Sequence, residues 1–197
     1  MGDGTQRAAE CEVAHGHDEA GPGPVGAGGD RVVVAVYAGA VAGALLRIAA
    51  ECGFRTVLVE PDASLPAPDG LPTATVRVAA VPEASSDLLD RADVVVCDHH
   101  RDDLGVPLRD ALASPARWVG IMGSPRHEPP HVPALAALGV PPEEIARVHR
   151  PIGLDIGSRT PAEIAVSTLA GLLADRNGRP GGPYRAPVGD REPERAT

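Results

Sequence analysis

Lysine is missing from this chain of 197 residues, and all 18 of its basic residues are arginine. Chemistry that needs a lysine amine, such as Schiff-base formation, pyridoxal phosphate attachment or a Walker-type phosphate loop, is therefore excluded. Aromatic residues make up only 2% of the chain, so it lacks the stacking platforms on which single-stranded nucleic acids bind. Because no apolar run approaches the roughly 18 residues of a membrane-spanning helix, we expect no membrane protein.

Cysteine is also scarce. The three cysteines, Cys11, Cys52 and Cys97, are far apart and form no C-x-x-C pair. This argues against a disulfide framework or a zinc ribbon and fits the reducing cytoplasm. We expect no secretory leader, because no apolar segment follows a basic start at the N-terminus. The formal net charge is −9, which repels phosphate backbones, so no nucleic-acid partner is expected.

Two segments rich in glycine, proline and charge frame an apolar centre. Residues 1–30 and 178–197 cannot bury enough apolar surface to offset the entropy lost on ordering. We therefore predict disordered tails around a single domain at residues 31–177. Overall, 43% of the chain is hydrophobic and 23% charged, the ordinary balance of a globular protein.

Five short runs rich in β-branched residues alternate with segments of helical spacing. Strands are expected at residues 31–36, 56–59, 75–78, 92–97 and 117–122. Helices are expected at residues 42–52, 108–113, 130–138, 142–148 and 161–176. Because strands separated by helices form right-handed crossovers, the pattern predicts one doubly wound parallel α/β sheet, Rossmann-like, with strand order 3-2-1-4-5. Ligands of such sheets bind at the carboxyl ends of strands one and four, where the strand order reverses.

The loop after the first strand resembles an altered dinucleotide fingerprint, G-x-G-x-x-G/A. Gly39 and Ala42 match its second and third positions, whereas Tyr37, a residue type that resists positive φ, stands at the first. Glu60 ends the second strand, 21 residues after Gly39, where an acid would bind ribose hydroxyls. Two interpretations remain open: a nucleotide site with weak affinity for NAD, or a tight turn without a ligand.

Polar residues also follow strands four and five. Gly123 and Ser124 can offer a backbone N–H and a hydroxyl to an anion, and Arg126 can add a guanidinium for phosphate. A plain turn is the alternative. His99 lies at the switch point beside His100, and adjacent histidines rarely chelate one metal, so pairing of one histidine with a nearby acid is favoured over a metal site.

The last helix has a clear start signal. Thr160, followed by proline and then by Glu163, forms a capping box. Asp155 precedes it between Gly153 and Gly157 in an otherwise apolar run. A buried carboxylate without a partner would be costly there, so Asp155 either stabilises the loop or faces a ligand.

Three stretches resemble the XdhC/CoxI family, the accessory factors of xanthine dehydrogenase and related molybdenum hydroxylases. Residues 149–167 are similar to its run H-x-P-I-G-L-D-I-G-x-x-T-P-x-E-I-A-x-S, and residues 119–124 resemble its V-G-x-I-G-S segment. His99 matches the histidine of its T-H-D motif. The resemblance covers about residues 31–176 and is limited to the family's C-terminal Rossmann-like domain.

The resemblance implies a maturation factor without catalytic residues of its own. It would bind a molybdopterin-type cofactor, whose phosphate suits a helix N-terminus or a glycine-rich turn. Implied partners are the apo-form of a molybdenum hydroxylase and a cysteine desulfurase. Residue patterns and resemblance together give these candidate cofactor-binding residues: Gly39, Ala40, Glu60, His99, Gly123, Ser124, Arg126 and Asp155.

The chain also departs from the family pattern. Tyr37 and Ala40 replace the first glycine and the histidine of the family's G-A-G-H loop, and we expect the family's N-terminal domain to be absent from this chain. A separate protein carrying that domain is therefore a further expected partner. Two alternatives remain: an NAD(P)-dependent oxidoreductase, for which the core leaves little room, and a protein-interaction module whose nucleotide loop has decayed.

Overall fold

The computed structural model describes residues 31–183 other than residues 125 and 127. The expected tail at residues 1–30 lies outside this part of the chain, and so do residues 184–197 of the tail expected at residues 178–197. The first residues of the expected C-terminal tail contact the domain. The N–H of Arg179 donates to the carbonyl of Ala174 at 2.8 Å, and Gly181 lies directly against the side chain of Leu154.

The described chain forms one parallel sheet of five strands. Its order is β3-β2-β1-β4-β5, which confirms the sequence prediction. The strands are β1 (Val32–Val36), β2 (Arg55–Val59), β3 (Val76–Val78), β4 (Ala92–Val96) and β5 (Trp118–Ile121). Every residue of β1 and β4 is buried, because these central strands have helices over both faces.

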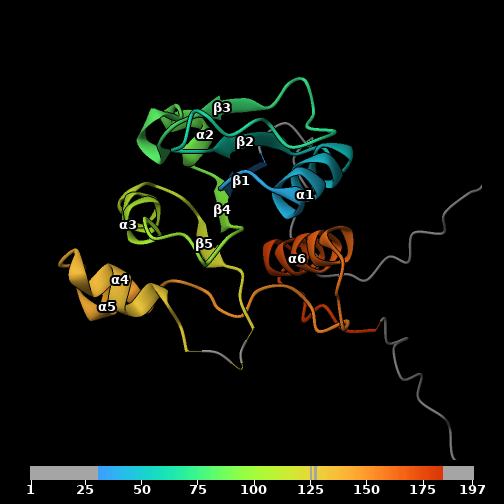
Figure 1. Ribbon diagram of the computed structural model, residues 1–197. Helices are drawn as coiled ribbons and strands as arrows, with labels where there is room; N and C mark the ends of the chain where they lie inside the picture. Colours follow the sequence, from blue (N-terminus) through green and yellow to red (C-terminus); the bar gives the residue numbers. More distant parts are fainter. Residues whose placement is uncertain (1–30, 125, 127, 184–197) are drawn as a thin grey trace, which may run out of the picture.

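Helices cover both faces of the sheet (Figure 1). They are α1 (Ala40–Glu51), the 3-10 turn η2 (Val81–Glu83), α2 (Ser86–Leu89), α3 (Gly105–Ala113), α4 (His131–Ala137), α5 (Pro142–Ile145) and α6 (Pro161–Arg176). α1 and α6 pack side by side on one face, and α2 and α3 lie on the other. The sequence analysis did not predict η2 and α2, because each is too short to show a helical period. Among the described residues, no helix has the length and apolarity to cross a membrane.

Alternate residues of β1 pack into two separate hydrophobic cores, one on each face of the sheet. Val32, Val34 and Val36 pack on the side of α2 and α3. Val33 and Ala35 pack on the side of α1 and α6. This division explains why the strand is apolar at every position instead of at every second one.

The helix ends are set by local sequence. α1 stops at a Schellman motif, in which Gly53 takes φ 79° and the N–H of Phe54 donates to the carbonyl of Ala49 at 2.9 Å. α6 begins with the predicted capping box, which the structure confirms. The N–H of Glu163 donates to the hydroxyl of Thr160 at 3.3 Å, and the N–H of Thr160 donates to the Glu163 carboxylate at 3.1 Å.

A buried carboxylate ties the far end of α6 to the sheet. Asp93 in β4 accepts hydrogen bonds from Arg117 at 2.8 Å and from Arg176 at 2.6 Å. Burial raises the pKa of Asp93, and the two guanidinium groups act in the opposite direction. Because Arg176 is the last residue of α6, these bonds fix the position of that helix relative to the sheet.

The segment before α6 extends the sheet beyond β5. The N–H of His149 donates to the carbonyl of Val119 at 2.9 Å, and the N–H of Ile121 donates to the carbonyl of His149 at 3.1 Å. The indole of Trp118 lies over Gly120 and stacks on the His149 imidazole, with 4.9 Å between ring centroids. This pairing carries residues 150–158 to the carboxyl edge of the sheet.

Candidate functional site

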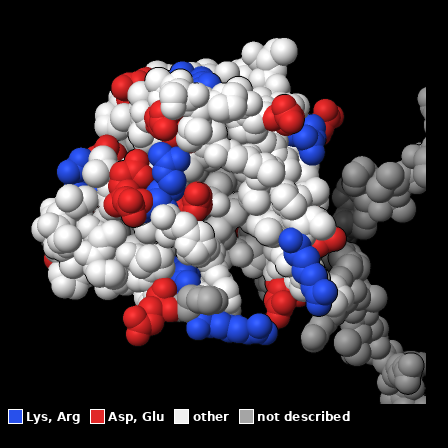
Figure 2. Space-filling model, in the orientation of Figure 1, with Lys and Arg blue, Asp and Glu red and all other residues white. Residues whose placement is uncertain are grey.

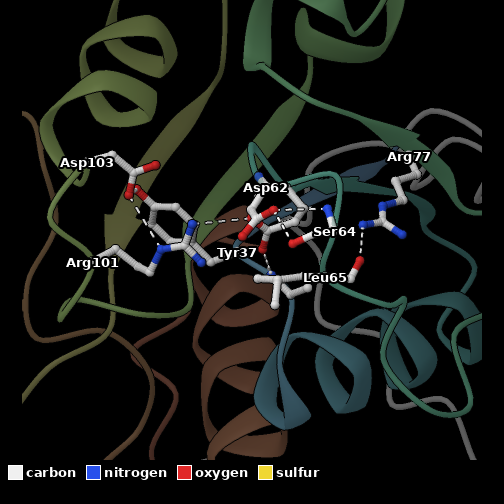
Figure 3. A network of polar contacts seen from close by, with 9 residues as sticks. Tyr37, Asp62, Ser64, Leu65, Arg77, Arg101 and Asp103 are labelled. Carbon is white, nitrogen blue, oxygen red and sulfur yellow. Dashed lines mark hydrogen bonds and ion pairs between the residues drawn. The ribbon is translucent and has the colours of Figure 1, made fainter.

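The first loop has Tyr37 at the position of the first glycine of a dinucleotide fingerprint. Tyr37 takes φ 73°, which the sequence analysis expected a tyrosine to resist, so that expectation was wrong. The side chain compensates for the strain through distant contacts. Its hydroxyl donates to the Asp103 carboxylate at 3.0 Å, and the Arg101 guanidinium lies 4.5 Å from the ring centroid (Figure 3).

Glu60, the expected ribose-binding acid, is only 2% exposed. One carboxylate oxygen accepts the N–H of Ala38 at 2.7 Å, and the other accepts the N–H of Asp62 at 2.9 Å. The guanidinium of Arg101 forms an ion pair with that second oxygen at 3.4 Å. Both oxygens of Glu60 are therefore already engaged by the protein.

The largest cavity at the carboxyl edge, which we call the main cavity, has a volume of about 700 Å³. It lies on the α1 and α6 side, between the segment after β5 and the loop before α6. Side chains of both charges border a hollow in this part of the molecule (Figure 2). Its size falls in the range of small-molecule sites. Five of the eight candidate residues line it: His99, Gly123, Ser124, Arg126 and Asp155.

The other three candidates lie elsewhere. Gly39 and Ala40 line a second cavity of about 650 Å³, between α1, the proline-rich loop after β2 and the start of α6. Glu60 lines neither cavity. Gly39 has extended backbone and no side chain caps α1, so the first-turn N–H groups of α1 remain available at this edge. The structure thus brings together the candidates that follow β4 and β5 and separates them from those that follow β1 and β2.

Two arginines surround Ser124 at the wall formed after β5. The guanidinium of Arg150 donates to the Ser124 carbonyl at 2.8 Å, and the N–H of Arg126 donates to the Ser124 hydroxyl at 3.3 Å. Gly123 makes this arrangement possible, since a Cβ at that position would lie 2.8 Å from Nε of Arg150. The result is a wall rich in positive charge and hydrogen-bond donors, which suits an anion.

The opposite wall is the loop before α6, and two glycines shape it. Gly153 and Gly157 take φ 86° and 68°, which explains the glycines on either side of Asp155. Asp155 is exposed, and within residues 31–183 no hydrogen bond or ion pair joins its carboxylate to another described group. The loop is instead held by Ser167, whose hydroxyl donates to the Leu154 carbonyl at 2.6 Å.

Several lining residues were not found by sequence reasoning. They are Val41, Ile164, Ser167 and Thr168. The available signal was weak: Ser167 ends the family-like run at residues 149–167, but its apolar surroundings are typical of any core helix.

Cys97 and His99 line the main cavity beside β4. Burial, followed by the charge of Asp98, raises the pKa of Cys97 to about 12, so the thiol stays protonated at neutral pH and is a poor nucleophile. The His99 ring contacts that of His100 with 4.0 Å between centroids. In the described part of the chain, no group of three histidine, cysteine or acidic side chains is placed to hold a metal ion.

Comparison with known proteins identifies the family. The model of the XdhC Rossmann domain matches residues 33–172. The uncharacterized protein YqeB of Escherichia coli K12 is 33% identical over 154 residues, which cover 76% of this chain and 28% of YqeB. The chain therefore spans less than a third of this curated relative.

A solved structure shares the fold. The crystal structure of a xanthine dehydrogenase from Bacillus halodurans is 20% identical, with a TM-score of 0.58, over 80% of this chain and 45% of that one. At this identity the likeness shows the fold alone. The family match at residues 33–172 includes the strands of the sheet and both walls of the main cavity. It confirms the family resemblance that residues 149–167 indicated. The chain belongs to the XdhC family through its Rossmann domain.

Proposed function

We propose that this chain binds a molybdopterin-type cofactor in the main cavity and serves in the maturation of a xanthine dehydrogenase or carbon monoxide dehydrogenase type of molybdenum hydroxylase. One observation carries the proposal. The two most family-specific segments, residues 119–124 and 149–167, are distant in sequence yet form facing walls of one cavity.

The residues present fit such a ligand. A phosphate needs cationic and hydroxyl donors, which Arg126 and Ser124 supply, and bare backbone at Gly123 leaves room for close approach. A polar ring system needs an acceptor for its N–H groups, and the Asp155 carboxylate is exposed on the opposite wall. The first turn of α1 reaches the cavity at Val41 and adds a favourable dipole for an anion.

In this proposal the chain holds and shields the cofactor. The apolar side chains of Val41, Met122 and Ile164 exclude water from part of the cavity, and the protonated Cys97 thiol does not attack the ligand. The bound cofactor carries the molybdenum chemistry that the hydroxylase later uses. We further propose that the apo-hydroxylase, a cysteine desulfurase and a separate protein with the remaining family domain are its partners.

Pterin content tests the proposal. The parent chain and the Arg126→Ala variant are purified from cells that make the cofactor, and the denatured extracts are oxidised to a fluorescent pterin and quantified. We expect pterin with the parent and at least tenfold less with the variant. Arg109→Ala is the matched control, because Arg109 is an exposed arginine of α3 that pairs only with its neighbour Asp110 among the described residues. Equal pterin in parent and Arg126→Ala, or none in the parent, contradicts the proposal.

A further inference from the structure

The carboxyl edge contains a second polar group of residues that the proposed function does not use. Tyr37 follows β1, Glu60 follows β2, and Arg101 and Asp103 follow β4. We call these four residues the polar plug. In this sheet topology, a dinucleotide binds in the crevice where strand order reverses, between β1 and β4. The polar plug lies at the ends of these strands, and Figure 3 shows Tyr37, Arg101 and Asp103 close together there.

The side chains of the polar plug bind one another. Arg101 forms ion pairs with Glu60 at 3.4 Å and with Asp103 at 3.5 Å. Tyr37 joins the same group through its hydrogen bond to Asp103. Desolvation by burial, followed by the charge of Asp103, raises the pKa of Tyr37 far above neutral pH. Tyr37 therefore remains a neutral donor, and the chain after β4 is fastened across the end of β1.

This closure removes the acceptor that a dinucleotide needs. In a dinucleotide site the acid at the end of the second strand accepts hydrogen bonds from ribose hydroxyls. The Glu60 side chain is fully buried, and its two oxygens already accept two backbone N–H groups and the Arg101 ion pair. A ribose could reach it only by displacing these contacts and leaving buried donors without partners, which is costly.

The charges of the polar plug are also unsuited to the pyrophosphate of a dinucleotide. The plug contains the carboxylates of Glu60 and Asp103 and one guanidinium, so its net charge is −1. The exposed carboxylate of Asp62, which is held by the hydroxyl of Ser64 at 2.6 Å, adds a further negative charge next to Glu60. The guanidinium of Arg101 is already paired with both carboxylates of the plug, so it is not available to a pyrophosphate. Arg126, in contrast, lines the main cavity, and Arg150 donates to the Ser124 carbonyl in its wall.

From these contacts we infer that the polar plug is a specificity determinant that excludes adenine dinucleotides from the Rossmann crevice and confines ligands to the main cavity. The inference rests on the proposed function only for the identity of the accepted ligand, which would be held through its phosphate without a ribose at the end of β2. The closed crevice itself is independent of that identity.

ADP-ribose tests the inference, because it carries the adenosine ribose and pyrophosphate without a nicotinamide. Binding to the full chain is measured by titration calorimetry, with the melting curve of each variant as the check on folding. We expect no saturable binding to the parent up to millimolar concentration. Arg101→Ala removes the ion pair from the Glu60 oxygen that also accepts the N–H of Asp62. Combined with Tyr37→Gly, it should make the chain bind ADP-ribose at least tenfold more tightly than the parent.

A third substitution tests whether the ribose of ADP-ribose binds at Glu60 in the double variant. Adding Glu60→Gln to the double variant should abolish the gain, since the amide keeps one acceptor oxygen but loses the charge and the second acceptor. Arg109→Ala, outside the plug, should behave as the parent. ADP-ribose binding by the parent as tight as that of the double variant overturns the inference, and so does a cooperatively melting double variant without any gain.

The milder variant Arg101→Gln provides the same comparison if the double variant does not fold. Glutamine keeps more of the side-chain volume than alanine does, and a folded Arg101→Gln variant without tighter ADP-ribose binding also overturns the inference. The pterin measurement stays separate. A parent chain without pterin, or equal pterin in the parent and Arg126→Ala, contradicts the proposed function, whereas ADP-ribose binding by the parent contradicts only the exclusion.

Discussion

The hydroxyl of Ser167 donates to the carbonyl of Leu154 at 2.6 Å, and the N–H of Leu154 donates back to the carbonyl of Ser167 at 3.1 Å. A serine inside a helix often bonds to the carbonyl one turn earlier. Here it bonds outward to the preceding loop instead. This reciprocal pair fastens one wall of the main cavity to α6, so the position of that wall depends on the packing of the helix.

Gly171→Ala should therefore lower the melting temperature and reduce pterin binding. Alanine in place of glycine normally stabilises a helix interior by about 1 kcal/mol. At this position, however, an added Cβ would lie 3.0 Å from Cα of Gly153 and push the loop off the helix. Thermal unfolding is the measurement. Gly182→Ala, where no atom lies within 4 Å of an added Cβ, serves as the control, and a stabilised Gly171→Ala variant would contradict the close contact.

Removing the buried carboxylate of Asp93 should destabilise the fold strongly. Asp93→Ala leaves Arg176, whose side chain is only 13% exposed, without its anion, and losses on this scale are about 3 kcal/mol. Chemical denaturation measures the change. Asp87→Ala is the comparison, because Asp87 and its partner Arg55 are exposed and such pairs contribute little. A near-equal effect of the two changes would show that the Asp93 ion pairs do not hold α6.

Sequence alone was sufficient for the topology. The continuous β-branched runs marked central strands, and their alternation with helical segments fixed the order of the sheet. Local signals were equally reliable, since the cap at Gly53 and the capping box at Thr160 involve residues within five positions of each other. These features depend on neighbours in the chain, which a sequence displays directly.

The candidate site was harder to derive, because it depends on residues far apart in the chain. Glu60 matched the position of a ribose-binding acid, but its carboxylate is engaged by Arg101, which lies 41 residues further along. Tyr37 takes positive φ because Asp103, 66 residues away, holds its hydroxyl. No local pattern indicates such pairings. His99, Ser124 and Asp155, in contrast, could be brought together from topology alone, because each follows or faces a strand end.

Acid should weaken the capping box at the start of α6. The N–H groups of Arg159 and then Thr160 hold the pKa of Glu163 below its ordinary value of 4.5. A lowered carboxyl pKa stabilises the folded state above the ordinary value, and this contribution is lost as the pH falls through the folded-state pKa. The melting temperature of the parent should thus exceed that of Glu163→Gln at neutral pH, and the gap should close at low pH.

The glutamine variant is a suitable comparison because it keeps an oxygen that accepts the same N–H bonds and lacks only the charge. The gap in melting temperature should be constant above about pH 6, well clear of the ordinary carboxyl range. A gap that persists unchanged below the ordinary pKa of Glu163 would show that geometry, and not charge, provides its contribution.

Gly120→Ala should displace the indole of Trp118, and this displacement can be observed directly. The indole lies across Gly120, so an added Cβ would overlap it, and the side chain of Ile152 would lie 2.9 Å away on the same side. Overpacking of this kind costs about 2 kcal/mol. Trp118 is the single tryptophan of the chain, so the emission spectrum reports its environment without ambiguity. We expect a red shift, as the indole leaves His149 and meets water, together with a lower melting temperature. Unchanged emission from a folded Gly120→Ala variant would contradict the stacked arrangement at the edge of β5.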